Sequence, residues 1–486
     1  MPSSTLAAPG VAPFSPSPSV ASLRELFDRQ HARRARVAAS TPRERAEKLR
    51  RLGAVIRAHR GDLAEAMRVD FGRHPDESEL TDIQLILAEL NHAIKHLARW
   101  MKPVRVSTPV WVGLGSSEVR YEPQGVVLIL GAWNFPFMLL IGPLVPAIAA
   151  GNCVILRPSE KVPHTNAVLA KIVAEAFEPD EVALVEGGVS TAEALLELPF
   201  DHIFFTGSVG VGKRIMAAAA KTLASCTLEL GGKSPAIVDE SADIAMAGER
   251  LVWGKFTSAG QACVAPDYVF VHRSRRAELV AAMQRTLSRF YGDTEEDRER
   301  SADFSRVVDA ASVARLGALV EDAAQRGATI VTGGRWDAAT RYVAPTILTD
   351  VPHDAAVMED EIFGPVLPVL DYDDLDEVFR FIRTRGKPLA LYIFSRDKAS
   401  VSRVLANTSA GGTAVNNALV HLANPNLPFG GVGSSGFGSY HGLAGFKAFS
   451  HERSVFVQKM SGASLYYPPY GPRTRRLVEW MARLRG

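Results

Sequence analysis

The sequence predicts an α/β protein built from two doubly wound parallel sheets. From residue 125 onward, short apolar runs alternate with helical stretches, and runs that are apolar on both faces are typical of a parallel sheet covered by helices on both sides. The runs form two series, with a boundary near residues 229–234. The first series covers 125–130, 153–156, 182–185, 202–205 and 226–230, and the second covers 236–238, 268–271, 329–331, 366–370, 389–394 and 412–415. A length of 486 residues also suggests two or three domains.

The first hundred residues predict helices. Residues 20–38, 42–68 and 77–100 carry apolar side chains spaced three and four apart. The segment before them, residues 1–21, is rich in Ala, Pro and Ser. It lacks a basic start followed by an apolar run, so we expect a disordered extension and no secretory signal.

Residues 104–121 alternate apolar and polar side chains around 113–116, which predicts a long β-hairpin. A hairpin arm after a helical start often serves assembly, although ordinary surface hairpins are equally common. The Pro- and Gly-rich residues 424–442 predict a long loop.

Composition excludes several classes of protein. The chain is 47% hydrophobic and 22% charged, unlike collagen-like or disordered chains. A net charge of +2 gives no electrostatic case for nucleic acid. Three cysteines are too few and too scattered for a disulfide framework or a cysteine-based zinc site, so we expect no metal and a reducing, cytoplasmic location.

Residues 123–156 contain no charged side chain and could span a bilayer by length. Pro136, Pro143 and Pro146 interrupt them, together with Asn134 and Asn152. We therefore expect a strand, a loop, a short helix and a second strand there.

Cys263 lies in a turn of small residues, 258–266, which leaves a side chain reachable. A thiolate there could act as a nucleophile, whereas a single cysteine is more often a small buried hydrophobic residue. Cys153 and Cys226 lie within apolar strand patterns and fit the second description.

Two polar residues come at the ends of predicted strands. Asn134 follows the first strand, where α/β proteins bind ligands, and its amide could donate to an oxyanion or cap the next turn. Glu229 ends an apolar strand, and burial would raise its pKa toward that of a general base. Its alternative role is an ion pair with Lys233. Glu361 is similarly ambiguous, and Phe363 is by default core.

Residues 205–213 join a strand to a helix through three glycines, and the helix N-terminus could bind a phosphate. The segment nearly matches a P-loop, but Arg214 replaces the hydroxyl residue that would hold Mg²⁺, so an ATPase is not favoured. The alternative is a turn that only allows close packing.

Together these segments resemble the aldehyde dehydrogenase superfamily, from about residue 20 to residue 470, and most closely its class 3 branch. The resemblance rests on motifs in this order: Trp133-Asn134-Phe135-Pro136, Arg157-Pro158-Ser159-Glu160, Phe205-Thr206-Gly207-Ser208, Leu228-Glu229-Leu230-Gly231-Gly232-Lys233, Gly260-Gln261-Ala262-Cys263, Glu361-Ile362-Phe363-Gly364-Pro365 and Pro428-Phe429-Gly430-Gly431. The runs 264–269 and 466–470 point to class 3.

The resemblance implies an NAD(P)-dependent enzyme that oxidises an aldehyde to a carboxylic acid through a thiohemiacetal and a thioester. Cys263 would be the nucleophile, Asn134 and the Cys263 N–H would hold the oxyanion, and Glu229 would activate water. The residues implied in cofactor binding are Trp133, Arg157, Glu160, Gly207, Ser208, Gly212, Glu361 and Phe363.

Glu160 would bind the adenosine ribose and repel a 2′-phosphate, which favours NAD, with NADP as the alternative. Arg157 stands where the family usually has Lys, which bears on that preference. The class 3 resemblance also implies aromatic or medium-to-long-chain aliphatic aldehydes as substrates and a homodimer.

The domains implied are a disordered extension (1–21), a Rossmann-like dinucleotide-binding domain (22–103 and 123–228), a bridging and oligomerisation element (104–122 and 424–460), a catalytic domain (229–423) and a tail helix (461–486). The tail has an apolar stripe of Leu477, Trp480, Met481 and Leu484 among arginines. It could pack on the body or a partner subunit, cover a substrate tunnel, or touch a membrane surface.

Two rival functions remain at this level. One is an enzyme of the same fold that forms acyl-CoA or acts as a reductase, and such relatives can lack the Glu229 equivalent. The other is a non-catalytic structural protein, which has no need of Cys263, Asn134 and Glu229 together.

Overall fold

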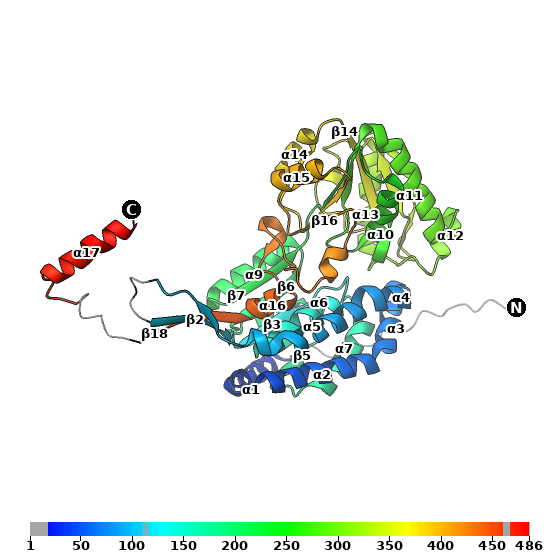
Figure 1. Ribbon diagram of the computed structural model, residues 1–486. Coiled ribbons are helices and arrows are strands. Elements are labelled where there is room, and N and C mark those ends of the chain that lie inside the picture. The colour runs from blue at the N-terminus through cyan, green and yellow to red at the C-terminus, as the bar shows by residue number, and fades with distance from the viewer. Residues whose placement is uncertain (1–17, 110–111, 113–114, 460–466, 486) are drawn as a thin grey trace.

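The computed structural model describes residues 18–109, 112, 115–459 and 467–485. It has two lobes stacked on each other, an arm of strands that leaves the first lobe, and a tail helix beyond the arm (Figure 1). The prediction for residues 1–21 falls mostly outside the described residues. Helix α1 (Val20–Ala38) already begins at Val20, where the Ser19 side chain accepts a hydrogen bond from the Ser22 N–H.

The first lobe contains a six-stranded sheet in the order β17-β7-β6-β3-β4-β5. Five strands are parallel and follow the first predicted series: β3 (Val126–Leu130), β4 (Cys153–Arg157), β5 (Val182–Leu184), β6 (His202–Gly207) and β7 (Ser225–Leu230). The sixth, β17 (Gly436–Phe437), is antiparallel and pairs Gly436 with Glu229. The predicted loop 424–442 thus contributes an edge strand to this sheet.

Helices cover both faces of this sheet, which confirms the doubly wound prediction. Alternate side chains of β3 point to opposite faces, Val127 and Ile129 into one core and Val126 and Leu128 into the other. The first core is closed by α2 (Pro42–Ala58), α3 (Arg60–Phe71), α5 (Gln84–Trp100), α6 (Met138–Ala150) and α7 (Pro163–Ala176). The second is closed by α1, α8 (Val189–Leu196) and α9 (Val209–Thr222).

Two predicted helices are broken. The 42–68 pattern is split between α2 and α3 at His59, and the 77–100 pattern consists of α4 (Pro75–Ser78), a π-helical turn (Glu79–Ile83) and α5. Residues 123–156 form β3, a loop, α6 and β4, as predicted. Among the described residues, the structure contains no helix with the length and hydropathy needed to cross a bilayer.

The second lobe contains a seven-stranded sheet in the order β10-β13-β14-β9-β8-β15-β16. Its strands are β8 (Pro235–Val238), β9 (Tyr268–His272), β10 (Thr329–Thr332), β13 (Thr346–Thr349), β14 (Val366–Tyr372), β15 (Ala390–Phe394) and β16 (Gly412–Val415). All are parallel except β10, which pairs antiparallel with β13. β13 was not predicted. The helices against this sheet are α10 (Ile244–Phe256), α11 (Arg276–Tyr291), α13 (Ala310–Gln325), α14 (Leu375–Thr384) and α15 (Lys398–Asn407); a short helix, α12 (Glu295–Arg300), follows α11.

The arm is a three-stranded sheet in the order β1-β2-β18. β1 (Val104–Val106) does pair antiparallel with β2 (Gly115–Pro123), but for three residues only. The main partner of β2 is β18 (Ser450–Gln458), paired along all nine residues. The long hairpin predicted for 104–121 is therefore wrong in extent, and part of its predicted turn lies outside the described residues. Between β17 and the arm, α16 (Gly442–Ala448) packs on α5 and α6.

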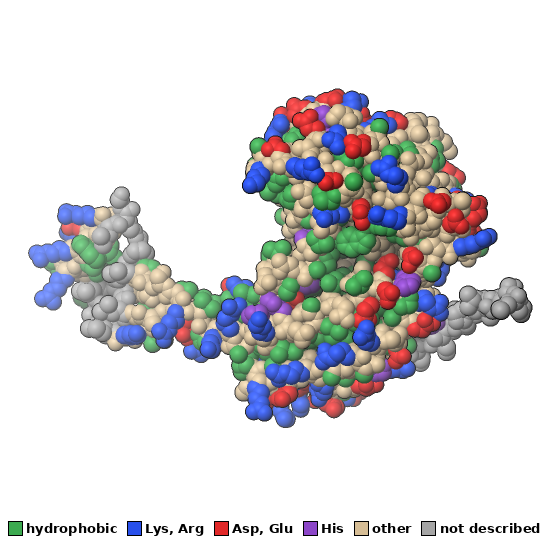
Figure 2. All heavy atoms as spheres, turned by 45° about the vertical axis from the view of Figure 1, so that its right-hand side comes forward, with side chains coloured by type: hydrophobic (Ala, Val, Ile, Leu, Met, Phe, Trp, Pro, Cys, Tyr) green, Lys and Arg blue, Asp and Glu red, His purple; other side chains and the backbone are tan. Residues whose placement is uncertain are grey.

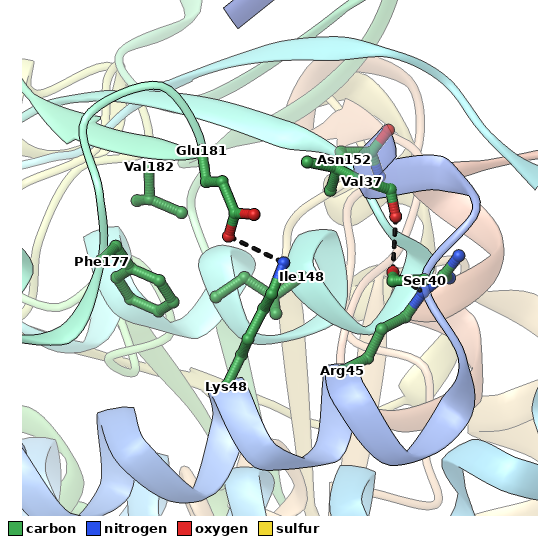
Figure 3. Close-up of a pocket in the computed structure, with 9 residues that line it drawn as sticks. All are labelled: Val37, Ser40, Arg45, Lys48, Ile148, Asn152, Phe177, Glu181 and Val182. Atoms are coloured by element: carbon green, nitrogen blue, oxygen red, sulfur yellow. Dashed lines mark hydrogen bonds and ion pairs between the residues drawn. The ribbon is translucent and has the colours of Figure 1, made fainter. Parts of the chain in front are cut away.

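The buried guanidinium of Arg45 joins the ends of α1 and α6. It donates to the carbonyls of Ala38, Ala149 and Ala150, which the ends of the two helices leave without partners. A small cavity lies beside it, where Lys48 and Glu181 form an ion pair of 2.7 Å (Figure 3). This cavity is at the amino ends of β4 and β5, the opposite edge of the sheet from Asn134 and Glu229.

Candidate active site

Cys263 follows a tight turn in the second lobe. After α10, Ser258 (φ 52°) and Ala259 (φ 52°) adopt left-handed backbone, and Gly260 (φ 72°) continues it. A Cβ at position 260 would lie 2.3 Å from the Gly364 carbonyl oxygen. The turn therefore brings the Cys263 loop against the loop that carries Glu361 and Phe363.

As whole residues, Cys263 and Cys226 are partly exposed, whereas Cys153 is buried. Burial raises the pKa of the Cys263 thiol well above its usual value, and the charges of Glu361 and Glu229 raise it further. The backbone N–H groups of Cys263 and Val264 act in the opposite direction and lower this pKa. The thiol thus holds its proton until a base removes it.

Asn134 lies in the loop that follows β3, and only 3% of its surface is exposed. Its Nδ2 donates to the Gln261 carbonyl at 2.9 Å, so the amide is held two residues from Cys263. The side chain therefore crosses to the second lobe and does not cap its own turn. The structure thus brings the Asn134 side chain against the loop that carries Cys263.

Glu229 lies near the end of β7 and is 3% exposed. Neither carboxylate oxygen has a hydrogen-bond partner among the described residues, and burial raises the pKa of Glu229 well above its usual value. The predicted alternative, an ion pair with Lys233, is wrong. Lys233 pairs with Asp267 at 2.5 Å and donates to two backbone carbonyls.

The Lys233–Asp267 pair supports the Glu361 loop. Asp267 also accepts a hydrogen bond from the Ile362 N–H at 3.1 Å, next to Glu361. Burial and the Asp267 charge raise the pKa of Glu361 to about 8. The sequence motifs contain Lys233 but gave no role to Asp267, whose partners are distant in the chain.

The glycine-rich turn lies where β6 meets α9. Ser208 caps α9 by accepting the Val211 N–H, and the space beside Gly210 is open. A Cβ at Gly212 would come within 2.8 Å of the Leu230 side chain, so this glycine allows α9 to pack closely on β7. The structure is compatible with both predicted roles of this segment. Gly212 allows α9 to pack closely on the sheet, and the N-terminus of α9 is open at the carboxyl end of the sheet.

Arg157 and Glu160 lie beyond the end of β4 at the same edge. Arg157 Nη2 donates to Glu160 Oε2 at 2.7 Å and to the Gly187 carbonyl at 2.8 Å. The guanidinium thereby fixes one oxygen of the Glu160 carboxylate. The rings of Trp133 and Phe363 meet edge to face at 5.4 Å, between the two lobes.

The residues predicted from sequence therefore gather along the junction between the lobes, at the carboxyl ends of the strands of the first sheet and before the amino ends of β9 and β14 in the second sheet. Figure 2 shows hydrophobic side chains gathered at the waist between the lobes on the face turned to the viewer. A doubly wound α/β sheet binds its ligands at the carboxyl ends of its strands, which in this structure is the edge of the first sheet that faces the junction.

Comparison with known proteins agrees with this arrangement. The model of the aldehyde dehydrogenase family matches residues 20–455. The chain belongs to this family. It is an NAD(P)-dependent aldehyde dehydrogenase, which oxidises aldehydes to carboxylic acids.

Among curated proteins, the 4,4'-diaponeurosporen-aldehyde dehydrogenase of Staphylococcus aureus is 44% identical over 88% of this chain and 92% of its own length. The dimeric NADP-preferring aldehyde dehydrogenase of Rattus norvegicus is 40% identical over 89% of this chain and 94% of its own. Among solved structures, a substrate-bound state of Staphylococcus aureus AldH superposes with a TM-score of 0.89 and 41% identity, covering 94% of this chain and 99% of that chain.

The aldehyde dehydrogenase fits a dinucleotide at the junction. The N-terminus of α9, with open space beside Gly210, suits a pyrophosphate. Glu160 Oε1 accepts no hydrogen bond within the described part of the chain and suits a ribose hydroxyl. Thr206 lies at the end of β6 with a buried hydroxyl that has no partner among the described residues. An NAD⁺ complex of a Bacillus cereus aldehyde dehydrogenase superposes with a TM-score of 0.83 and 28% identity, covering 91% of this chain and 90% of that chain.

Proposed function

We propose that Cys263, Asn134 and Glu229 carry the reaction, with NAD as the preferred cofactor and with aromatic or medium-to-long-chain aliphatic aldehydes as substrates. The observation behind this proposal is the meeting of three buried or half-buried polar groups from separate segments at one junction. The case for a catalytic role is strongest for Glu229, because its buried carboxylate has no structural partner in the described part of the chain.

Acylation begins at sulfur. Cys263 Sγ attacks the aldehyde carbon, and its proton passes to the Glu229 carboxylate, whose raised pKa suits it to accept one. Asn134 uses one N–H for the Gln261 carbonyl, so its second N–H is left to donate to the oxyanion, together with the Cys263 N–H. NAD held at the junction would supply the hydride acceptor for this oxidation, so that the aldehyde carbon would be left as a thioester on Cys263.

Deacylation needs a base. Glu229 first releases the proton received from Cys263 to solvent and then takes a proton from water. The hydroxide adds to the thioester carbon, the carbon–sulfur bond breaks to release the carboxylic acid, and the Cys263 thiolate that leaves takes the proton back from Glu229. Burial suits Glu229 to this step, since a carboxylate with an ordinary pKa would be a weak base at neutral pH.

The remaining residues position the cofactor. We propose that Glu361 binds the nicotinamide ribose and that Trp133 and Phe363 border the ring, since the edge-to-face pair lies at the junction. Ser208, Gly207 and Gly212 would line the phosphate path at the start of α9. Glu160, held by Arg157, would bind the adenosine ribose.

The apolar substrate preference is supported by side chains beside Cys263. Phe135, Leu139, Ala262 and Ala265 form a small hydrophobic cluster, with Met138 partly buried against it. It joins the Asn134 loop to the Cys263 loop. Such a wall favours aldehydes with an aromatic or alkyl body over charged ones.

Purified protein with NAD and a panel of aldehydes, followed at the absorbance of reduced nicotinamide, tests the proposal. We expect turnover with hexanal and benzaldehyde without CoA. Turnover only in the presence of CoA would favour the acylating rival, and no turnover with any aldehyde would favour the structural protein.

We also propose a homodimer, because the rat relative is named dimeric and the arm exposes two unpaired sheet edges in its described part.

The role of α17 (Pro472–Arg485) remains a prediction. The helix would pack on the body or a partner subunit, cover a substrate tunnel, or contact an anionic membrane surface through its exposed Arg473, Arg475, Arg476 and Arg483. Co-sedimentation with phosphatidylserine vesicles, compared with phosphatidylcholine vesicles, distinguishes membrane contact from the other roles of α17. Binding to neither contradicts membrane contact.

A further inference from the structure

Arg73 is buried completely between the two lobes. It follows Gly72, the left-handed residue that ends α3, and its side chain is 0% exposed. The guanidinium lies between the rings of Phe71 and Phe135, 4.9 Å and 4.8 Å from their centroids. A fully buried cation requires partners, and those of Arg73 belong to the two loops of the active site.

One end of the guanidinium contacts both loops. Arg73 Nη2 donates to the Asn134 carbonyl at 2.6 Å and to the Ser258 hydroxyl at 2.6 Å. Asn134 carries the proposed oxyanion donor, and Ser258 begins the left-handed turn before Cys263. A single planar group thus fixes the distance between the two loops.

Two carboxylates extend the same bridge. Arg73 Nη1 donates to Asp82 at 2.9 Å, and Asp82 accepts the Met138 N–H at 2.6 Å, at the start of α6. Glu77 lies 3.7 Å from Arg73 Nε and accepts the Ser258 N–H at 2.9 Å. Each loop is therefore held twice, once by the cation directly and once by a carboxylate paired with it.

The turn needs such support. Left-handed backbone at Ser258 and Ala259 is unfavourable for residues with a side chain, and it persists only where surrounding contacts hold it. The Ser258 contacts to Arg73 and Glu77 supply that restraint. Without it, the turn could relax and carry Cys263 away from the Asn134 amide.

We propose that Arg73 is a positioning residue for the first chemical step: it holds the Cys263 loop and the Asn134 loop at the separation that acylation requires. The proposal rests on the proposed function, since it assumes that Cys263 is the nucleophile and Asn134 the oxyanion donor. Arg73 itself touches neither substrate nor cofactor. Its effect is on geometry, and a shift of about 1 Å in such a site can slow the reaction about a hundredfold.

The test is the burst of reduced nicotinamide in the first turnover. Arg73→Lys keeps the positive charge, but a single ammonium nitrogen replaces the two separated nitrogens of the guanidinium, one of which contacts Asp82 and the other Asn134 and Ser258. We expect its burst rate constant with hexanal to fall roughly 10- to 100-fold, while the Kd of NAD, measured by calorimetry, stays within about twofold. The rate of Cys263 alkylation by iodoacetamide should also change.

Arg45→Lys is the matched control. Arg45 is a buried arginine that also donates to carbonyls of two segments, but it lies at the far edge of the first sheet. We expect it to lower the melting temperature and leave the burst rate constant unchanged. Equal slowing in Arg45→Lys and Arg73→Lys would overturn the proposal, because it would reduce the effect to lost stability.

Ser258→Ala keeps Arg73 and removes one anchor only, so it serves if Arg73→Lys does not fold. A slower burst with an unchanged Kd of NAD supports the proposal, and a burst equal to that of the parent enzyme overturns it. If the parent enzyme's burst survives complete alkylation of Cys263, the proposed function itself is wrong, which is a separate result.

Discussion

At the residue scale, the site combines three groups whose ionisation is coupled. Glu229 and Glu361 both raise the pKa of the Cys263 thiol, and burial raises the pKa of each carboxyl in turn. A second negative charge among these three groups costs free energy, so the ionisation of one group favours the protonated form of the other two. Burial thus favours the protonated form of Glu229, and its carboxylate is a stronger base than an exposed one.

The rate of deacylation should therefore depend on pH through Glu229. The carboxylate is the active form, and its pKa is raised, so the rate should fall as the pH drops through that raised pKa and level off above it. Single-turnover release of acid between pH 5 and 9 measures this. In Glu229→Gln the residual rate should lose the inflection, and an inflection that persists in the variant would assign it to another group.

Cys263→Ser should abolish turnover and leave NAD binding intact, because a hydroxyl is a far weaker nucleophile and differs little in size. Steady-state activity and calorimetric NAD titration check the two halves of this prediction. Cys226→Ser is the control, since Cys226 is also partly exposed and lies on β7 outside the proposed chemistry. Loss of NAD binding in Cys263→Ser would show a structural role instead.

The Glu160 carboxylate should decide between NAD and NADP. Glu160→Ala removes the charge that repels a 2′-phosphate. It also releases Arg157 from the hydrogen bond that this residue donates to Glu160 in the parent structure. We expect kcat/KM for NADP relative to NAD to rise about tenfold or more, in keeping with a charge interaction of roughly 1.4 kcal/mol. An unchanged ratio would place the 2′-hydroxyl elsewhere.

Single residues differ in how far sequence could predict them. Asn134 and Glu229 stand at strand ends and Cys263 in a turn of small residues, but the local pattern left a structural role open for each, and only the family resemblance assigned them catalytic roles. Arg73 was missed because its contacts with Asn134 and Ser258 join positions 61 and 185 residues apart. The ion pair considered for Glu229 and Lys233 failed for the same reason, since the partner of Lys233 is Asp267, 34 residues away.

At the scale of elements, the left-handed turn before Cys263 is the critical local structure. Gly260→Ala should be destabilising, because left-handed backbone costs about 1–2 kcal/mol for alanine and the added Cβ would meet the Gly364 carbonyl at 2.3 Å. Chemical denaturation measures the change, and activity should fall with it.

Gly61→Ala provides the comparison within the same chain. Gly61 lies in α3, and an added Cβ there meets nothing within 4 Å. We expect a gain of about 0.5–1 kcal/mol, since alanine favours a helix over glycine. If Gly260→Ala were as stable as the parent, the turn would not be held as the structure shows.

Elements with strong apolar patterns were predictable, and pairing directions were not. Eleven of the strands fall within predicted apolar runs or beside them, but β10 and β17 run antiparallel to their neighbours. No helix lies between β10 and β13 in the chain, and β17 joins the first sheet from a distant segment, so the apolar runs did not indicate either direction. β13 was missed because Thr346–Thr349 is short and half polar. β1 is short and exposed along its whole length, so alternation overstated its extent.

At the scale of the whole molecule, two sheets face one junction and an arm extends away from it (Figure 1). The arm strands lack a hydrophobic core of their own: β1 is exposed and β2 only half-buried. A sheet of this kind is stable when another surface covers it. We therefore expect light scattering to give a mass near twice the 52.5 kDa of one chain. A monomer at micromolar concentration would contradict the proposed dimer.

The central claim is that Cys263 carries the acyl group and that Glu229 is needed to release it. The most direct measurement is the intact mass, followed by peptide mapping, of Glu229→Gln after mixing with NAD and hexanal and quenching in acid. The account predicts a stable mass increase equal to one hexanoyl group, located on the peptide that contains Cys263. Full steady-state activity without any adduct, or an adduct on another residue, would contradict it.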